Sequence, residues 1–183
     1  TLNSLCELLP NITVEDGAKV SVNAPNVPYY WDFSQGYDLC TNSRHEGTEI
    51  WTIGKNNTPT PNTGPQQEPF TFLYTETSLP SRIKDVHTFE TCDVEVKPNA
   101  YYSVNFNLLM RGKHVGVFNL STSLDQGQTW QSALGFSDSG VVRDDNDAVA
   151  SYTWYEWSYQ TFALHTETAD KLRLKLQATN VGM

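Results

Sequence analysis

"YYSVNFNLLM", residues Tyr101 to Met110, is the stretch that most clearly indicates how this chain folds. Every second residue from Tyr102 to Met110 is apolar, while serine and asparagines occupy positions 103, 105 and 107. Because successive side chains of a β-strand point to opposite faces, this alternation predicts a strand with one face on a core. "KLRLKLQA", from Lys171, repeats the pattern with leucines on one face and basic residues on the other.

Short runs of the same kind, separated by turn residues, extend outward from this strand in both directions. "FTFLYTE" begins at Phe70 and "HTFETCDVEV" at His87. The chain is rich in aromatic residues (12%), which suits pleated, half-buried sheets, and long helix-favouring runs are missing. Strands spaced by roughly 8–12 residues with turn signals between them predict an all-β fold, an antiparallel β-sandwich of jelly-roll type with long loops.

The 183 residues suffice for one well-buried domain. "KNNTPTPNTGPQQEP", residues 55–69, holds four prolines and shows no periodicity, so it is either a surface loop or a linker. Residues 1–54 are too few to bury a core of their own, which favours the loop. We therefore expect one sandwich domain over residues 1–183, as a fragment of a larger extracellular protein.

A net charge of −9 argues against a nucleic-acid partner and against docking on anionic lipid, because both require a basic face. No run of roughly 18 apolar residues occurs, so the sequence predicts no direct membrane insertion.

The cysteines and sequons favour an oxidising compartment, extracellular or lumenal. The cysteines form no CxxC pair, and we expect one disulfide with the third cysteine paired outside this chain; three buried thiols are the alternative. The disulfide candidates are Cys6, Cys40 and Cys92, and the glycosylation candidates are Asn11, Asn56 and Asn119.

"STSLDQGQTW", residues 121–130, has the spacing S-x-D-x-G-x-T-W, which resembles the Asp-box hairpin. An aspartate can bond nearby backbone amides and a glycine accepts positive φ, so the motif predicts a tight strand connection with the tryptophan folded back against the core. Its residues are Ser123, Asp125, Gly127, Thr129 and Trp130.

Asp-boxes recur in sialidase propellers, but this chain has one such motif and is too short for six four-stranded blades. The segment "VEVKPNAYYSVNFNLLMRGKHVGVFNLSTSLDQGQTW", with the later "TADKLRLKLQATNVGM", is instead similar to jelly-roll domains of reelin-repeat and MAM-like extracellular proteins. The resemblance covers Val94 to Met183 and implies an adhesive or ligand-binding module.

An acidic loop and two aromatic clusters are further candidates for binding sites. The loop "SDSGVVRDDNDAV" would supply carboxylates for Ca²⁺ from Asp144, Asp145 and Asp147, unless it is a solvated acidic turn. Trp31, Trp154 and Trp157 would stack on sugar rings, unless they belong to the core. The four histidines stand in no catalytic motif, so we expect no enzyme.

These features together predict a non-catalytic extracellular recognition module that binds a protein ligand, as a receptor ectodomain or an adhesion domain. The alternative is a carbohydrate-binding module of a secreted enzyme or of a viral or phage fibre, which would bind a glycan.

Overall fold

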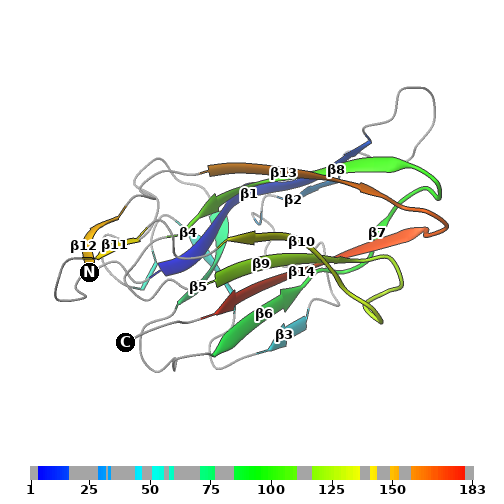
Figure 1. The fold of residues 1–183 in the computed structure, drawn as a ribbon. Helices are drawn as coiled ribbons and strands as arrows, with labels where there is room; N and C mark the ends of the chain where they lie inside the picture. Colours follow the sequence, from blue (N-terminus) through cyan, green and yellow to red (C-terminus); the bar gives the residue numbers. More distant parts are fainter. Residues whose placement is uncertain are drawn as a thin grey trace.

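The computed structural model of this chain describes residues 4–16, 29–31, 33, 44–46, 51–55, 58–59, 71–76, 85–110, 117–136, 141–143, 149–152 and 158–179. All elements in these ranges are strands (Figure 1), and all their pairings are antiparallel. The predicted all-β class is confirmed.

The first sheet has six strands in the order β13-β8-β1-β5-β4, with β2 paired to β1. The long strand β1 pairs with β8 along most of its length, while β5 and β2 share its other edge. The strands are β1 (Ser4–Asp16), β2 (Tyr29–Trp31), β4 (Thr52–Lys55), β5 (Thr71–Glu76), β8 (Tyr101–Leu109) and β13 (Ser158–His165).

The second sheet also has six strands, in the order β10-β9-β14-β6-β3, with β7 paired to the start of β14. Its members are β3 (Arg44–Glu46), β6 (Val86–Glu90), β7 (Val94–Glu95), β9 (Val117–Ser123), β10 (Gln131–Phe136) and β14 (Lys171–Thr179). A separate two-stranded ribbon joins β11 (Val141–Arg143) to β12 (Val149–Tyr152).

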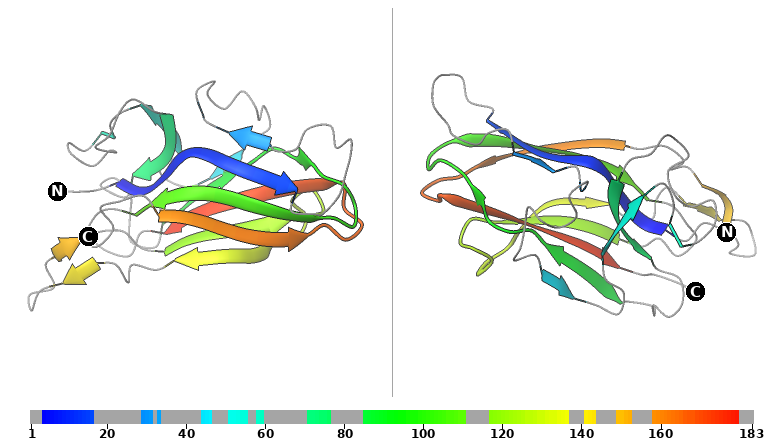
Figure 2. Two further views of the ribbon diagram at one scale, coloured as in Figure 1. Left: turned by 90° about the horizontal axis from the view of Figure 1, so that it is seen from above. Right: turned by 180° about the vertical axis from the view of Figure 1, so that it is seen from behind.

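The two large sheets lie face to face as two layers, with β13 and β10 on the same side (Figures 1 and 2). Aromatic contacts join the layers: the Phe118 ring of β9 lies 6.2 Å from Phe106 of β8 and 6.5 Å from Trp51, which precedes β4. The core between the sheets gives a sandwich-like arrangement, in which each sheet buries one apolar face.

The alternating patterns of the sequence are seen in burial. In β14 every second residue from Leu172 to Ala178 is buried, and in β8 Tyr102, Val104, Phe106 and Leu108 belong to the core. The strand predicted over Tyr101–Met110 is therefore present as β8, and its predicted apolar face points into the core.

A polar link also crosses the core between the sheets. The fully buried Trp51 donates its indole N–H to the carbonyl of His87, at 3.0 Å. The Thr75 hydroxyl of β5 lies 2.7 Å from the imidazole Nδ1 of the fully buried His87 in β6. These bonds satisfy polar groups that would otherwise be costly to bury.

Cys92, between β6 and β7, is disulfide-bonded. Its partner is not among the residues whose side chains the structure describes. Cys6 belongs to β1, of which only the backbone is described, and Cys40 falls outside the described residues. Most of the proline-rich stretch 55–69 also falls outside them.

Candidate functional site

The loop between β9 and β10 is organised around the Asp125 carboxylate. Its Oδ1 accepts hydrogen bonds from the Ser123 hydroxyl at 2.7 Å and the Thr129 backbone N–H at 2.8 Å. Its Oδ2 accepts the Thr129 hydroxyl at 2.5 Å, and the Ser123 hydroxyl oxygen accepts the N–H of Gly127 at 2.8 Å. The carboxylate therefore ties both ends of the loop together, as the motif predicts for these positions.

Positive backbone angles close this loop. Gln126 and Gly127 have φ angles of 60° and 89°. A β-carbon at Gly127 would lie 3.1 Å from the Arg173 guanidinium and 3.5 Å from the Trp130 ring. The glycine is needed both for its φ angle and for this close approach.

The hydrogen bonds also fix the charge of the loop. Donation from the Ser123 and Thr129 side chains and the Thr129 amide lowers the pKa of Asp125 to about 2, because these bonds favour the ionised carboxyl. Asp125 is thus a permanent anion near neutral pH, with both oxygens already engaged.

Trp130 lies on the outer surface of the second sheet. It is half-buried, and the Lys175 ammonium sits 4.1 Å from the centre of its ring. The expectation that Trp130 folds against the core is corrected: Lys175 lies on the outward face of β14, since its neighbours Leu174 and Leu176 point inward.

The turn from β13 to β14 faces this loop, and Thr166 anchors it. The Thr166 side chain is fully buried; its hydroxyl lies 2.6 Å from the Lys97 carbonyl and accepts the Ala100 N–H at 3.0 Å. Its backbone N–H donates to the Ala100 carbonyl at 2.9 Å. The next residue, Glu167, has a φ of 48°. The conformation of the turn is therefore fixed by hydrogen bonds to the β7–β8 connection as well as by its own residues.

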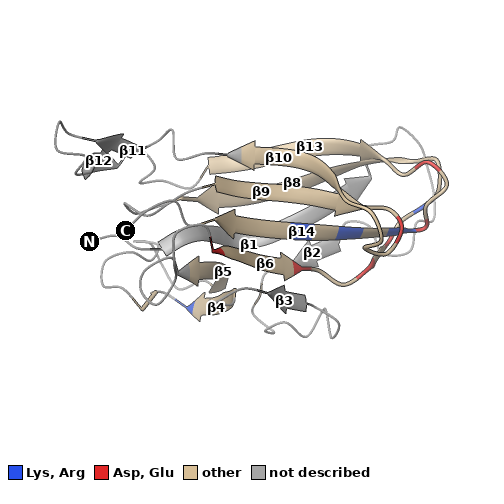
Figure 3. Ribbon diagram, turned by 60° about the horizontal axis from the view of Figure 1, so that its bottom comes forward, with Lys and Arg blue, Asp and Glu red and all other residues tan. Residues whose placement is uncertain are grey.

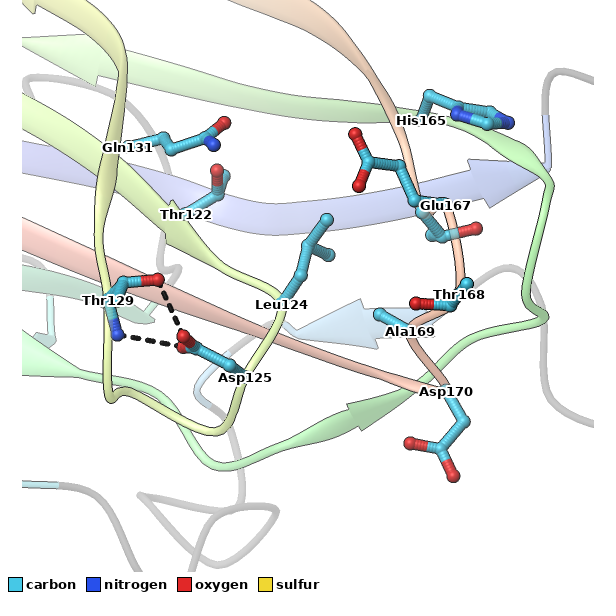
Figure 4. Close-up of a pocket in the computed structure, with 11 residues that line it drawn as sticks. Thr122, Leu124, Asp125, Thr129, Gln131, His165, Glu167, Thr168, Ala169 and Asp170 are labelled. Atoms are coloured by element: carbon cyan, nitrogen blue, oxygen red, sulfur yellow. Dashed lines mark hydrogen bonds between the residues drawn. The ribbon is translucent and has the colours of Figure 1, made fainter.

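A pocket of about 450 Å³ opens between this turn and the β9–β10 loop (Figure 4). It occupies the end of the sandwich beside the edge strands β10 and β13. It is lined by residues 165–170 on one side and by Thr122, Leu124, Asp125, Thr129 and Gln131 on the other.

Side chains from both walls face the pocket space in Figure 4. The carboxylate of Glu167 points toward Gln131 and Thr122, and Leu124 rises between the two walls. The carboxylate of Asp170, by contrast, points away. Thr122 is only 8% exposed, and its hydroxyl bonds to no other residue among those the structure describes. A buried hydroxyl without a partner is costly, so the pocket offers a ligand an unused polar group.

Acidic residues are found in the turns at this end of the molecule (Figure 3). The basic residues that begin β14 are already paired: Lys171 Nζ lies 2.5 Å from Glu95 Oε1, and Arg173 Nε lies 2.8 Å from Asp93 Oδ1. The pocket lining itself contains no lysine or arginine. The site therefore has a net negative charge when empty.

A second surface lies on the outer face of the first sheet. Tyr101 and Tyr159 are 60% and 63% exposed, and the Tyr101 ring lies against the His165 ring with 4.6 Å between centres and a tilt of 38°. Between them the Asn105 side-chain oxygen accepts hydrogen bonds from Ser103 at 3.0 Å and Thr161 at 2.6 Å. This face combines two exposed rings with an ordered polar row.

Several predicted site residues fall outside what the structure describes. Asp144, Asp145 and Asp147, Asn56, Trp154 and Trp157 are in undescribed ranges, and Asn11 and Trp31 lie in β1 and β2, without described side chains. Asn119 is half-buried in β9. Among the described residues, no group of three or more His, Cys, Asp or Glu side chains is arranged to hold a metal ion.

Thr122, Gln131 and Glu167 were missed as candidates from the sequence. Thr122 and Gln131 read as ordinary strand residues, and "ALHTETAD" gives no motif around Glu167. The one available signal was that Thr122 continues the inward-facing series of Phe118 and Leu120, where an apolar residue is expected.

No protein-family model, curated protein or solved structure matches this chain. No helix in the described ranges has the length and hydropathy needed to cross a membrane.

Proposed function

We propose that this chain is a non-catalytic extracellular recognition module that binds a protein partner, as a receptor ectodomain or an adhesion domain. The pocket at the end of the sandwich is the contact site. The observation that carries this proposal is the concave site of about 450 Å³, into which a nearly buried hydroxyl opens without a partner. Binding sites are commonly concavities of this size with a few convergent polar groups. This one is lined mainly by polar side chains, which suits a polar or charged group of the partner.

The walls of the pocket support a binding role because they are built before any ligand arrives. Asp125 holds the β9–β10 loop, and Thr166 holds the opposite turn. A rigid site loses less conformational entropy on binding, which favours affinity. Asp125, with both oxygens engaged in the loop, serves structure and not catalysis.

The compartment is proposed on chemical grounds. Cys92 is disulfide-bonded, and disulfides persist mainly in oxidising environments. The sequons at Asn11, Asn56 and Asn119 agree with an extracellular or lumenal location. A jelly-roll topology and kinship with reelin-repeat or MAM-like domains belong to the same proposal.

An array of secreted proteins and receptor ectodomains, probed with the multimerised chain, tests this function. Ala169→Trp should abolish binding to a partner found on the array, because Ala169 points into the pocket (Figure 4). Ala163→Trp is the matched control, since Ala163 is exposed on β13 outside the pocket lining. A partner that binds Ala169→Trp as well as the wild type contradicts the proposal.

A carbohydrate-binding function is the second candidate, favoured by the outer face of the first sheet. Exposed aromatic rings stack on sugars, and the exposed Thr161 hydroxyl between Tyr101 and Tyr159 would bond a sugar hydroxyl group, whereas Asn105 next to it is buried. On a glycan array, Ala163→Trp and Tyr159→Ala should then remove binding while Ala169→Trp retains it. An array without hits argues against this candidate.

A further inference from the structure

We propose that the end pocket binds the side-chain ammonium of a lysine presented by the partner protein. This inference rests on the proposed function and names the chemical group that the same site recognises. It follows from the acceptors, the charge and the apolar wall of the pocket, taken in turn.

Three acceptors converge on the pocket from three different elements. The Glu167 carboxylate comes from the β13–β14 turn, the Thr122 hydroxyl from β9 and the Gln131 amide oxygen from β10 (Figure 4). None of these side chains makes a hydrogen bond or ion pair with another residue in the described part of the chain. An ammonium group carries three N–H donors and no acceptor, which matches this set.

The charge of the site selects a cation. Asp125 remains ionised because its pKa is lowered to about 2, and Glu167 adds a second carboxylate. The nearby cations Lys171 and Arg173 are engaged by Glu95 and Asp93 and do not line the pocket. An anionic ligand would therefore be repelled, whereas a cation would be attracted.

The geometry of the acceptors favours lysine over arginine. A guanidinium is planar and binds best where two parallel acceptors of one carboxylate face it. The Glu167 carboxylate alone would accept from either cation, but the two further acceptors, Thr122 and Gln131, come from separate strands, an arrangement suited to a compact group that donates in three directions.

The remaining wall suits the alkyl part of a lysine. Leu124 and Ala169 line the pocket between the polar groups. Long basic side chains pack their methylene stems on apolar surface while the charged end finds polar partners. At about 450 Å³ the pocket exceeds one side chain, so residues flanking the lysine would also enter it.

The test uses Nα-acetyl-lysine methylamide as the probe, titrated into the ¹⁵N-labelled chain and followed by amide chemical shifts. We expect saturable shifts in residues 122–131 and 165–170. The same compound acetylated on Nε keeps the stem and loses the charge, and it should produce none. The arginine analogue should bind more weakly than the lysine compound.

Two variants and one matched control locate the interaction. Glu167→Gln and Thr122→Val should each lower the affinity for the probe. The first should lower it by about tenfold or more, the size expected for a lost hydrogen bond to a charged group. Asp170→Asn removes the same charge three residues away, where the carboxylate points out of the pocket and interacts electrostatically with Lys171. This control should leave the affinity nearly unchanged.

An equal loss of probe affinity in Glu167→Gln and Asp170→Asn would overturn the inference, because it would show that any nearby carboxylate attracts the probe to the same extent. Equal shifts from the Nε-acetylated compound, or no shifts from either, would overturn it too. A partner lost in Ala169→Trp but retained in Glu167→Gln would refute lysine recognition and leave the proposed function standing. A normal probe titration with every partner indifferent to Ala169→Trp would refute the pocket as the contact site of the partner, while its affinity for a lysine ammonium would stand.

Discussion

The Trp130 ring has two close neighbours: the Lys175 ammonium lies 4.1 Å from its centre, and a β-carbon at Gly127 would lie 3.5 Å from the ring. Both contacts lie on the outer surface of the second sheet, where neighbouring side chains replace only part of the water around the ring. A residue in this position stabilises the fold through partial burial and a cation–π contact, and the free energy of each is modest.

Trp130→Ala should therefore lower the free energy of unfolding by about 1–2 kcal/mol, as expected for an exposed cation–π contact with partial burial. Trp51→Ala is the comparison, since Trp51 is fully buried and truncation of such a side chain costs about 3–5 kcal/mol. Chemical denaturation of both variants measures the difference. Equal losses would show that Trp130 belongs to the core after all.

At the scale of the element, the β9–β10 loop is a hydrogen-bonded unit whose stability depends on one ionised group. The native pKa of Asp125 is below its ordinary value of 3.8, so the loop gains stability from the ionised form. This contribution is complete above about pH 4 and is lost as the pH falls through about 2.

The Asp125 carboxyl should titrate with a midpoint near 2 when followed by carbon NMR of the folded chain. Ser123→Ala should move the midpoint up toward 3.8, because the Ser123 hydroxyl is the largest cause of the shift. A midpoint near 3.8 in the unmodified chain would mean that the loop is open in solution.

At the scale of the whole molecule, His87 joins the two sheets through Thr75 and is completely buried. Burial lowers the pKa of the His87 imidazole below its usual 6.5, and the smaller effect of Asp85 acts in the opposite direction. The native chain thus holds a neutral imidazole at a pH where the unfolded chain has already taken up a proton.

Stability should consequently fall as the pH drops below 6.5 and level off below the native pKa of His87. The slope contributed by this proton is at most about 1.4 kcal/mol per pH unit. Denaturation between pH 7 and 4.5 measures it, and His87→Gln should remove this component while His165→Gln retains it. The same pH profile in wild type and His87→Gln would contradict the assignment.

The disulfide of Cys92 should have Cys40 as its partner. Arg44 pairs with Glu90 in antiparallel register, and we therefore expect the segment from Cys40 to Arg44 to continue alongside the residues that follow Glu90. Cys6, in contrast, pairs with Thr75 in the other sheet. Closing a loop of this length would stabilise the fold by about 4 kcal/mol in the chain-entropy description.

Peptide mapping under non-reducing conditions should find Cys40 linked to Cys92. Cys40→Ser should free the Cys92 thiol for alkylation, and Cys6→Ser should leave it protected. A peptide that links Cys6 to Cys92 would contradict this pairing.

The sequence by itself determined the strands and the loop at Asp125. Alternation along Tyr102–Met110 and Leu172–Ala178 identifies two strands because the period of side-chain direction is a local property of the backbone. The spacing of Ser123, Asp125 and Gly127 predicts the loop for the same reason, since all of its hydrogen bonds join residues within a few positions of one another.

Only the tertiary structure decided where these parts meet. The pocket joins Thr122 and Gln131 to Glu167, residues that are brought together because β10 and β13 are edge strands on the same side of the two sheets. The outward position of Trp130 depends likewise on Lys175 of β14. Such contacts arise from the pairing order of distant strands, which no local pattern encodes, so the fold class could be predicted from the sequence and the candidate site could not.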